Sequence, residues 1–474
     1  MNETDWNGPL TEAFGRAATY LDGLPDREVA PRASLEDLRE RLGGPLPDGP
    51  SEPTEVVGAL ADAVEDGLLA TGSGRFFGFV FGGAMPAALA ADWLSVAWDQ
   101  NACLYAAAPA ASVAEEVAAA WLIDVFGLPP GASTGFVTGA QMANVTGLAA
   151  ARHEVLRRVG WDVERGGLSG APRVTLLAGK SRHSTIDRAV RLLGFGLDNV
   201  ALVPSDGQGR IETTELRDAL ARVDGPAIVC AQAGNVDTGA VDPLEEVCDL
   251  SHAVGAWVHV DGAFGLWAAT SGDGQRRRLV AGLERADSWA TDAHKWLNVP
   301  YDSGLVFCAH PAAHRAAMSV RAAYLIHGAA DERDPMDLNP ESSRRARGFA
   351  VYAALRALGR SGVAELVDRT CDLATRLVDR LADHERVEIL NDVVLNQALV
   401  RFLSPTGDHD DLTRQVLAAV QRDGTCWMSG TTWQGRAAMR ISVSNWSTTA
   451  ADVDRSAASI LRCLESAAGS RADI

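Results

Sequence analysis

The feature that most constrains the fold is an alternation of short, β-rich apolar runs with helical runs between residues 71 and 309. Helical patterns, such as residues 142–158, separate successive runs. Strands that alternate with helices predict an α/β fold with a mostly parallel sheet and helices on both faces. Ligands of such sheets bind at the carboxyl ends of the strands. The predicted strands cover residues 173–178, 199–203, 227–231, 257–260, 288–290 and 304–308.

Two segments flank this α/β region. Residues 1–70 contain two amphipathic helical patterns separated by a Pro- and Gly-rich stretch. This segment is too small to bury much core, so we expect it to pack on another part of the protein or on a second subunit. Residues 331–474 combine a long helical stretch with short strands and predict a smaller α/β domain. The predicted division is therefore 1–70, 71–330 and 331–474.

Charge and cysteine content exclude several classes of function. The 474 residues include 43 Lys plus Arg and 62 Asp plus Glu, a net charge of -19, which argues against binding to nucleic acid or to an anionic membrane. The sequence shows neither a membrane span nor the pattern of a signal peptide. Its seven cysteines are dispersed and form no Cys-X-X-Cys pair. We therefore expect reduced thiols, a cytoplasmic location and no metal site.

The strongest chemical signal is the run Thr-Asp-Ala-His-Lys-Trp at residues 291–296, directly after a predicted strand. Lys295 stands between His294 and Trp296, in an apolar setting. A desolvated lysine loses its proton more readily and can form a Schiff base with an aldehyde. The alternative interpretation is an ordinary surface lysine.

A second signal is Asp261, which follows the apolar strand 257–260 and precedes Gly262. A buried carboxylate needs a positively charged partner, and a protonated pyridine nitrogen is one. The alternative is an aspartate that caps the turn at Gly262.

Two weaker signals lie at predicted helix starts. In residues 135–144, a strand-like piece turns through Gly139 into a helix, and such a turn presents free N–H groups to a phosphate. Many α/β turns carry glycine, so this signal alone is not specific. His183 stands at the start of another helix. It can stack on an aromatic cofactor, or it is an ordinary helix-start residue.

In this chain order, the four motifs resemble the group II decarboxylases that depend on pyridoxal 5'-phosphate (PLP). Members of that family act on glutamate, aromatic amino acids, histidine and related substrates, and have the aspartate aminotransferase fold, fold type I. The resemblance extends from about Arg75 to Asn445. The His-Lys-Trp run and the His-Val-Asp-Gly-Ala run at residues 259–263 carry it, and the glycine turn supports it.

The resemblance implies three catalytic residues. Lys295 would hold PLP as a Schiff base, and Asp261 would pair with the pyridinium nitrogen, which keeps the ring an electron sink. His183 would stack over the ring and approach the substrate.

The resemblance also implies further cofactor contacts. The backbone N–H groups of Ala140 and Gln141 would bind the phosphate, with His294 beside it. Asn235 falls where the family usually has threonine and would reach the ring hydroxyl.

For the substrate, the resemblance points to Arg440 and to an aromatic stretch. Arg440 matches a family arginine that binds the α-carboxylate, a role that suits a bidentate guanidinium; the alternative is a surface arginine on an edge strand. Phe76, Phe77 and Phe79 would lie near the substrate, or belong to the core. The family is typically a homodimer with shared active sites, which gives residues 1–70 a surface to wrap.

The implied reaction is decarboxylation of an L-amino acid to the amine and CO2, through an external aldimine and a quinonoid. The sequence shows no paired basic residues for a side-chain carboxylate, which favours an aromatic or apolar substrate. A Trp-rich stretch at residues 426–433 lines the pocket or belongs to the core.

One departure from the family leaves alternatives open. The family commonly carries a tyrosine proton donor on a mobile loop that corresponds to residues 327–340, which contain none; Tyr324 precedes them. Without that donor, the main alternative to decarboxylation is oxidation by dioxygen to an aldehyde. A carbon–carbon lyase or aldolase reaction is the second alternative. Retention of Lys295, Asp261 and His183 argues against a non-enzymatic scaffold.

Overall fold

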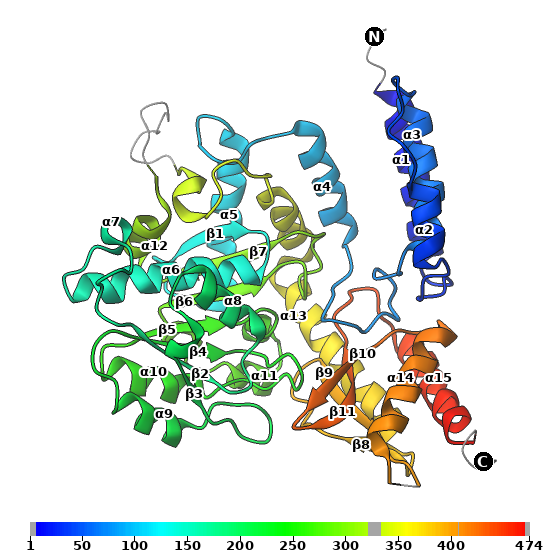
Figure 1. Ribbon diagram of the computed structural model, residues 1–474. Helices are drawn as coiled ribbons and strands as arrows, with labels where there is room; N and C mark the ends of the chain where they lie inside the picture. Colours follow the sequence, from blue (N-terminus) through cyan, green and yellow to red (C-terminus); the bar gives the residue numbers. More distant parts are fainter. Residues whose placement is uncertain (1–5, 321–332, 406, 470–474) are drawn as a thin grey trace.

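The computed structural model describes residues 6–320, 333–405 and 407–469. Within these residues, seven strands form a large sheet in the order β1-β7-β6-β5-β4-β2-β3 (Figure 1). The pairs from β3 to β6 are all parallel, and β7 is antiparallel to both of its neighbours. The strands are β1 (Ser133–Val137), β2 (Thr175–Gly179), β3 (Val200–Val203), β4 (Ala227–Gln232), β5 (Trp257–Asp261), β6 (Ser288–Asp292) and β7 (Gly304–Cys308).

The predicted α/β class, with helices on both faces of a mostly parallel sheet, is confirmed. Side chains alternate between the two faces along each strand because a strand has a period of two residues. In β5, Val258 and Val260 belong to the core under α5, α9 and α10, whereas Trp257 faces the core under α6, α8 and α12. These helices are α5 (Pro109–Phe126), α6 (Ala140–Arg158), α8 (Ser184–Leu192), α9 (Thr213–Leu220), α10 (Leu244–His252) and α12 (Pro311–Met318).

A second sheet lies toward the C-terminus. Its four described strands are all antiparallel and have the order β10-β11-β9-β8, and α14 and α15 pack beside them (Figure 1). The sequence analysis missed β10 and assigned its residues to a Trp-rich stretch. The elements are β8 (Val387–Ile389), β9 (Gln397–Phe402), β10 (Ser429–Trp433), β11 (Arg436–Ser442), α14 (His409–Asp423) and α15 (Ala450–Gly469).

The long helix α13 (Gly348–Ala382) joins the cores of the two sheets. Its residues up to Cys371 belong to the core of the large sheet, and those from Leu373 onward belong to the core of the small sheet. The two cores therefore meet along α13, and the division at residue 331 stays a prediction.

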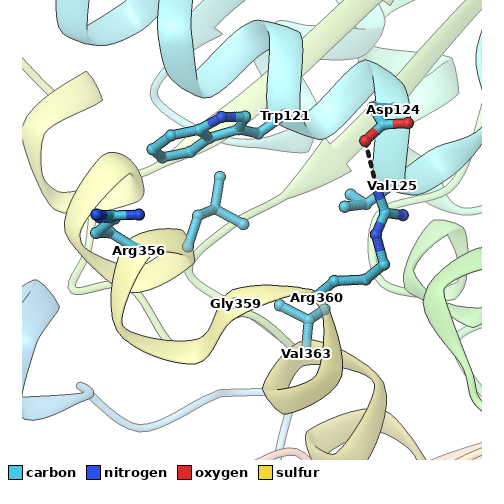
Figure 2. A pocket seen from close by; sticks show the side chains of 8 residues that line it. Trp121, Asp124, Val125, Arg356, Gly359, Arg360 and Val363 are labelled. Carbon is cyan, nitrogen blue, oxygen red and sulfur yellow. Dashed lines mark hydrogen bonds and ion pairs between the residues drawn. The ribbon is translucent and has the colours of Figure 1, made fainter.

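A glycine breaks α13. Gly359 has φ 61° and ψ 179°, a conformation outside the helical region. A cavity of about 230 Å³ opens beside it against α5, with Trp121 on one side and the Arg360–Asp124 ion pair at its edge (Figure 2). The lining residues include none of the predicted site residues.

The N-terminal helices stand apart from both sheets (Figure 1). They are α1 (Asn7–Gly23), α2 (Leu35–Leu42) and α3 (Pro53–Val64); every residue of them is described, and none is buried. A short contact joins α1 to α4 (Pro86–Trp98), where the rings of Phe14 and Trp93 lie 6.2 Å apart. None of the described helices is long and apolar enough to cross a membrane.

Candidate functional site

The candidate site lies at the carboxyl ends of β5 and β6, on the sheet face that α6 covers. Asp261 is the last residue of β5, and Asp292, the last residue of β6, precedes the turn that carries Lys295. The N-termini of α6 and α8 come to the same edge. This is the position that the parallel sheet predicts for a ligand.

Asp261 is 4% exposed and accepts three hydrogen bonds. Its Oδ2 accepts from Nδ2 of Asn144 at 3.1 Å and from Oγ1 of Thr185 at 3.4 Å. Its Oδ1 accepts from the N–H of Ala263 at 3.2 Å, so the carboxylate also caps the turn after β5. Asp261 therefore caps the turn, and its pairing with a pyridinium nitrogen stays a prediction.

Lys295 is not an ordinary surface residue. Its side chain is 20% exposed, and Nζ lies 3.0 Å from Oδ2 of the buried Asp292. The other oxygen of Asp292 accepts a 2.5 Å hydrogen bond from the N–H of Ala140, the first residue of α6. Asp292 thus joins the lysine to the helix start, a role that the sequence analysis missed.

His183 approaches Asp261 through Thr185, whose hydroxyl lies 2.9 Å from His183 Nδ1 and 3.4 Å from Asp261 Oδ2. Its Nδ1 accepts a hydrogen bond from the N–H of Thr185 at 3.3 Å, so the imidazole is also the N-cap of α8. Burial lowers the pKa of His183; the charge of Asp261 opposes this shift, and those of Lys295 and Arg440 add to it. His183 therefore lies within electrostatic reach of all three groups.

Arg440 comes from the small sheet, on β11. This strand lies between β10 and β9, so the edge-strand interpretation is wrong. The side chain is 12% exposed, and its Nη1 lies 3.8 Å from Oδ1 of Asp237. Burial lowers the pKa of Arg440, and the nearby Asp237 opposes that shift. Its role toward a substrate carboxylate stays a prediction.

The N-terminus of α6 has the features of an anion site. Its N-cap is Gly139, which has no side chain to accept from the first N–H groups of the helix. Gly304 packs so closely that a Cβ there would lie 2.3 Å from Cα of Gly139. The side chain of Gln141 donates to the carbonyl of Thr185, and the N–H of Ala140 donates to the carboxylate of Asp292.

His294 lies beside the same carboxylate. Its Nδ1 accepts from the N–H of Ser303, and its Nε2 lies 3.3 Å from Oδ1 of Asp292.

Asn235 holds a turn rather than facing open space. Its Oδ1 accepts from the N–H groups of Asp237 and Thr238, and its Nδ2 donates to the carbonyl of Ser181. Through this turn, Asn235 places Asp237 beside Arg440. Its predicted contact with a ring hydroxyl remains a prediction.

The aromatic stretch divides between core and surface. Phe77 is fully buried in the core of the small sheet. Phe76 is 1% exposed and stacks on Trp427 at 5.2 Å, whereas Phe79 is 46% exposed and contacts the same indole. The packing of Phe77 favours the core interpretation, and Phe79 alone of the three has a substantial exposed surface.

Asn298 is a positioning residue that the sequence analysis missed. It is fully buried, and its Oδ1 accepts from the N–H groups of Gly83 at 2.6 Å and Trp446 at 2.9 Å. Its Nδ2 donates to the carbonyls of Trp296 and Ser444. One carboxamide therefore ties the turn after Lys295 to two distant segments. Its only sequence signal is an asparagine three residues after the lysine.

These residues fit PLP. A lysine, a buried carboxylate at a strand end, an imidazole linked to that carboxylate through Thr185 and the N-terminus of α6 match the aldehyde, the ring nitrogen, the ring face and the phosphate. The tyrosine-free loop at residues 327–340 falls partly on residues 321–332, which lie outside the described residues, as does Tyr324. The described residues hold no cluster of three or more His, Cys, Asp or Glu side chains that could bind a metal.

The fold and this residue set define a PLP-dependent enzyme of fold type I. The model of the pyridoxal-dependent decarboxylase conserved domain matches residues 36–403. The chain belongs to the pyridoxal-dependent decarboxylase family, which confirms the resemblance; it is a carboxy-lyase, and its cofactor is PLP.

Several relatives illustrate the range of the family. The chain is 25% identical to an aromatic-L-amino-acid decarboxylase of Bacillus atrophaeus, over 91% of this chain and 89% of the relative. It is 30% identical to an L-2,4-diaminobutyrate decarboxylase of Rhizobium meliloti, over 76% of this chain and 72% of the relative. A 4-hydroxyphenylacetaldehyde synthase of Rhodiola rosea is 26% identical, over 87% of this chain and 85% of the relative. The structure of an Oryza sativa TDC with PLP and tryptamine superposes with a TM-score of 0.91 at 24% identity, over 99% of both chains.

Proposed function

We propose that this chain decarboxylates an aromatic or apolar L-amino acid and releases the amine and CO2. The observation that carries the proposal is the arrangement at the carboxyl ends of β5 and β6, where the buried Asp261 and Lys295 lie and where His183 contacts the hydroxyl of Thr185, which in turn contacts Asp261. PLP, when bound, supplies the electron sink for the bond cleavage. Lys295 would bind its aldehyde, Asp261 would hold a proton at the ring nitrogen, and Arg440 would orient the substrate carboxylate.

His183 is the proposed proton donor. Because Nδ1 accepts the hydrogen bond of the Thr185 N–H, the proton of the neutral imidazole is on Nε2. Burial lowers the pKa of His183 and favours this neutral form. Delivery of a proton to the substrate α-carbon, the role that a loop tyrosine has in the family, would require the imidazolium form, which the charge of the nearby Asp261 favours.

A specific observation favours a second candidate, oxidation to an aldehyde. Residues 327–340 contain no tyrosine, and one relative is named a 4-hydroxyphenylacetaldehyde synthase. A panel of L-amino acids with PLP, scored for CO2, amine, ammonia and peroxide, separates the outcomes. Amine and CO2 without peroxide support decarboxylation, and peroxide with ammonia supports the aldehyde branch. An aldehyde without CO2 would point to a lyase or aldolase, and no turnover of any amino acid would refute the enzymatic proposal.

We further propose that the chain is a homodimer in which residues 1–70 wrap the partner. The helices α1, α2 and α3 bury none of their residues. Large apolar side chains on them and at the N-cap of α1 are more than half exposed, among them Trp6, Leu10 and Leu60. An apolar surface of this kind is typical of an interface. Light scattering should give twice the chain mass, and Leu10→Lys should shift the protein toward monomer. A wild-type monomer would refute the proposal.

We also propose a cytoplasmic location. All seven cysteines are free, and six of them are buried in the described fold, as expected for a chain in a reducing compartment. Cell fractionation of a tagged chain tests this, and recovery in a secreted or membrane fraction would contradict it.

A further inference from the structure

A series of buried polar side chains leads from Asp261 into the interior of the large sheet. Asn144 Nδ2 donates to Asp261 Oδ2 at 3.1 Å, and Asn144 Oδ1 lies 2.9 Å from His259 Nε2. His259 Nδ1 lies 2.8 Å from Ser288 Oγ, which accepts from Trp257 Nε1 at 2.9 Å. Asn144, His259, Ser288 and Trp257 are fully buried. We call these four side chains the Asp261 relay.

The chemistry of its two ends fixes the direction of every hydrogen bond in the relay. An indole N–H can only donate, and an ionised carboxylate can only accept. Ser288 Oγ therefore accepts from Trp257 and donates its proton to His259 Nδ1. The histidine then carries its proton on Nε2 and donates to Asn144 Oδ1, which leaves the amide N–H of Asn144 pointing at Asp261.

The strand period explains how these residues meet. Trp257, His259 and Asp261 alternate along β5 and share the face that α6 covers, and Ser288 lies directly opposite His259 on β6. Gly147 of α6 leaves room for the imidazole, since a Cβ there would lie 2.7 Å from His259 Cε1. Asn144, one helical turn earlier, then reaches both His259 and Asp261.

A purely structural role explains this arrangement poorly. Burying polar side chains costs free energy unless each is hydrogen-bonded, and an apolar core would avoid the requirement. Burial also lowers the pKa of His259 to about 3, which keeps the imidazole neutral, and its hydrogen bonds to Ser288 and Asn144 hold it in a single tautomer. The other side-chain donor to Asp261, Thr185 Oγ1, lies farther away at 3.4 Å and also faces His183 Nδ1 at 2.9 Å. Asn144 is therefore the firmest side-chain donor to the carboxylate.

We propose that the Asp261 relay is a positioning device that fixes the orientation of the Asp261 carboxylate toward the ring nitrogen of PLP. PLP affinity then depends on Ser288, which is three hydrogen bonds from Asp261. This inference rests on the proposed function, because Asp261 must meet the cofactor for its orientation to matter.

The test measures the dissociation constant of PLP for the apo full-length chain by equilibrium dialysis. Asn144→Leu removes the donor and should raise the dissociation constant about tenfold, the effect of one charge-assisted hydrogen bond. Ser288→Ala lets the imidazole change tautomer and the Asn144 carboxamide turn over, and should raise it about threefold. Thr146→Val is the matched control, since Thr146 is buried on α6 and its hydroxyl donates to the carbonyl of Met142, outside the relay. It should bind PLP as the wild type does.

A double-mutant cycle separates positioning from general damage to the fold. In an Asp261→Ala background, Asn144→Leu and Ser288→Ala should no longer change PLP affinity, because the group they orient is gone. The same shift in both backgrounds would overturn the relay, as would variants with wild-type affinity. If Asn144→Leu does not fold, the Ser288→Ala cycle carries the test alone. A wild-type chain without saturable PLP binding would instead overturn the proposed function, and the relay with it.

Discussion

Replacing Asn298 by alanine should destabilise the chain and weaken PLP binding together. The side chain is fully buried and makes four hydrogen bonds to backbone groups of Gly83, Trp446, Trp296 and Ser444. At about 1 kcal/mol of net stabilisation for each, the variant should lose about 4 kcal/mol of unfolding free energy. PLP affinity should fall as well, because the turn that carries Lys295 loses its attachment to two segments.

Asn396→Ala is the matched control. Asn396 is equally buried, and its carboxamide bonds to Val443, Ser444 and Gln397. It shares the partner Ser444 with Asn298, but its bonds lie away from the turn that carries Lys295. We expect a loss of about 3 kcal/mol with unchanged PLP affinity. Urea titration of the apo chain, followed by tryptophan fluorescence, measures stability, and equilibrium dialysis measures PLP binding. Wild-type stability of Asn298→Ala, or an equal loss of PLP affinity in both variants, would refute the reasoning.

Three further predictions follow from the site and its surroundings. Lys295→Ala should lose the absorbance band at about 420 nm that PLP develops as a Schiff base with the wild type; a retained band would exclude this lysine as the Schiff-base residue. Arg440→Gln should raise KM for the amino acid about ten- to a hundredfold with unchanged PLP affinity, and an unchanged KM in steady-state kinetics would count against carboxylate binding. Burial lowers the pKa of His259 to about 3 and of His314 to about 4, so the unfolded chain binds these protons first as pH falls below 6.5. The free energy of unfolding should therefore drop by about 2 kcal/mol per histidine between about pH 7 and about pH 5. His314→Gln should reduce that loss in urea titrations at these two pH values.

Much of the large sheet could be predicted because its strands are short, apolar and separated by helical patterns. The strand at residues 304–308 was predicted with its observed ends, and the start of α6 at Ala140 follows from the turn at Gly139. The strand β10 was missed because its small and polar residues show no apolar alternation. It forms by pairing with β11, a contact that no local pattern contains.

The sequence by itself determined the α/β class and the motifs that carry Lys295 and Asp261, because strand alternation and residue type are local properties. Only the tertiary structure decided which groups surround them. Asn144 donates a hydrogen bond to Asp261, which lies 117 positions away in the chain. Asn298 accepts one from Trp446, which lies 148 positions away. Such partners are brought together by sheet register and helix packing, and a single polar residue with a distant partner leaves no periodic signal in the chain.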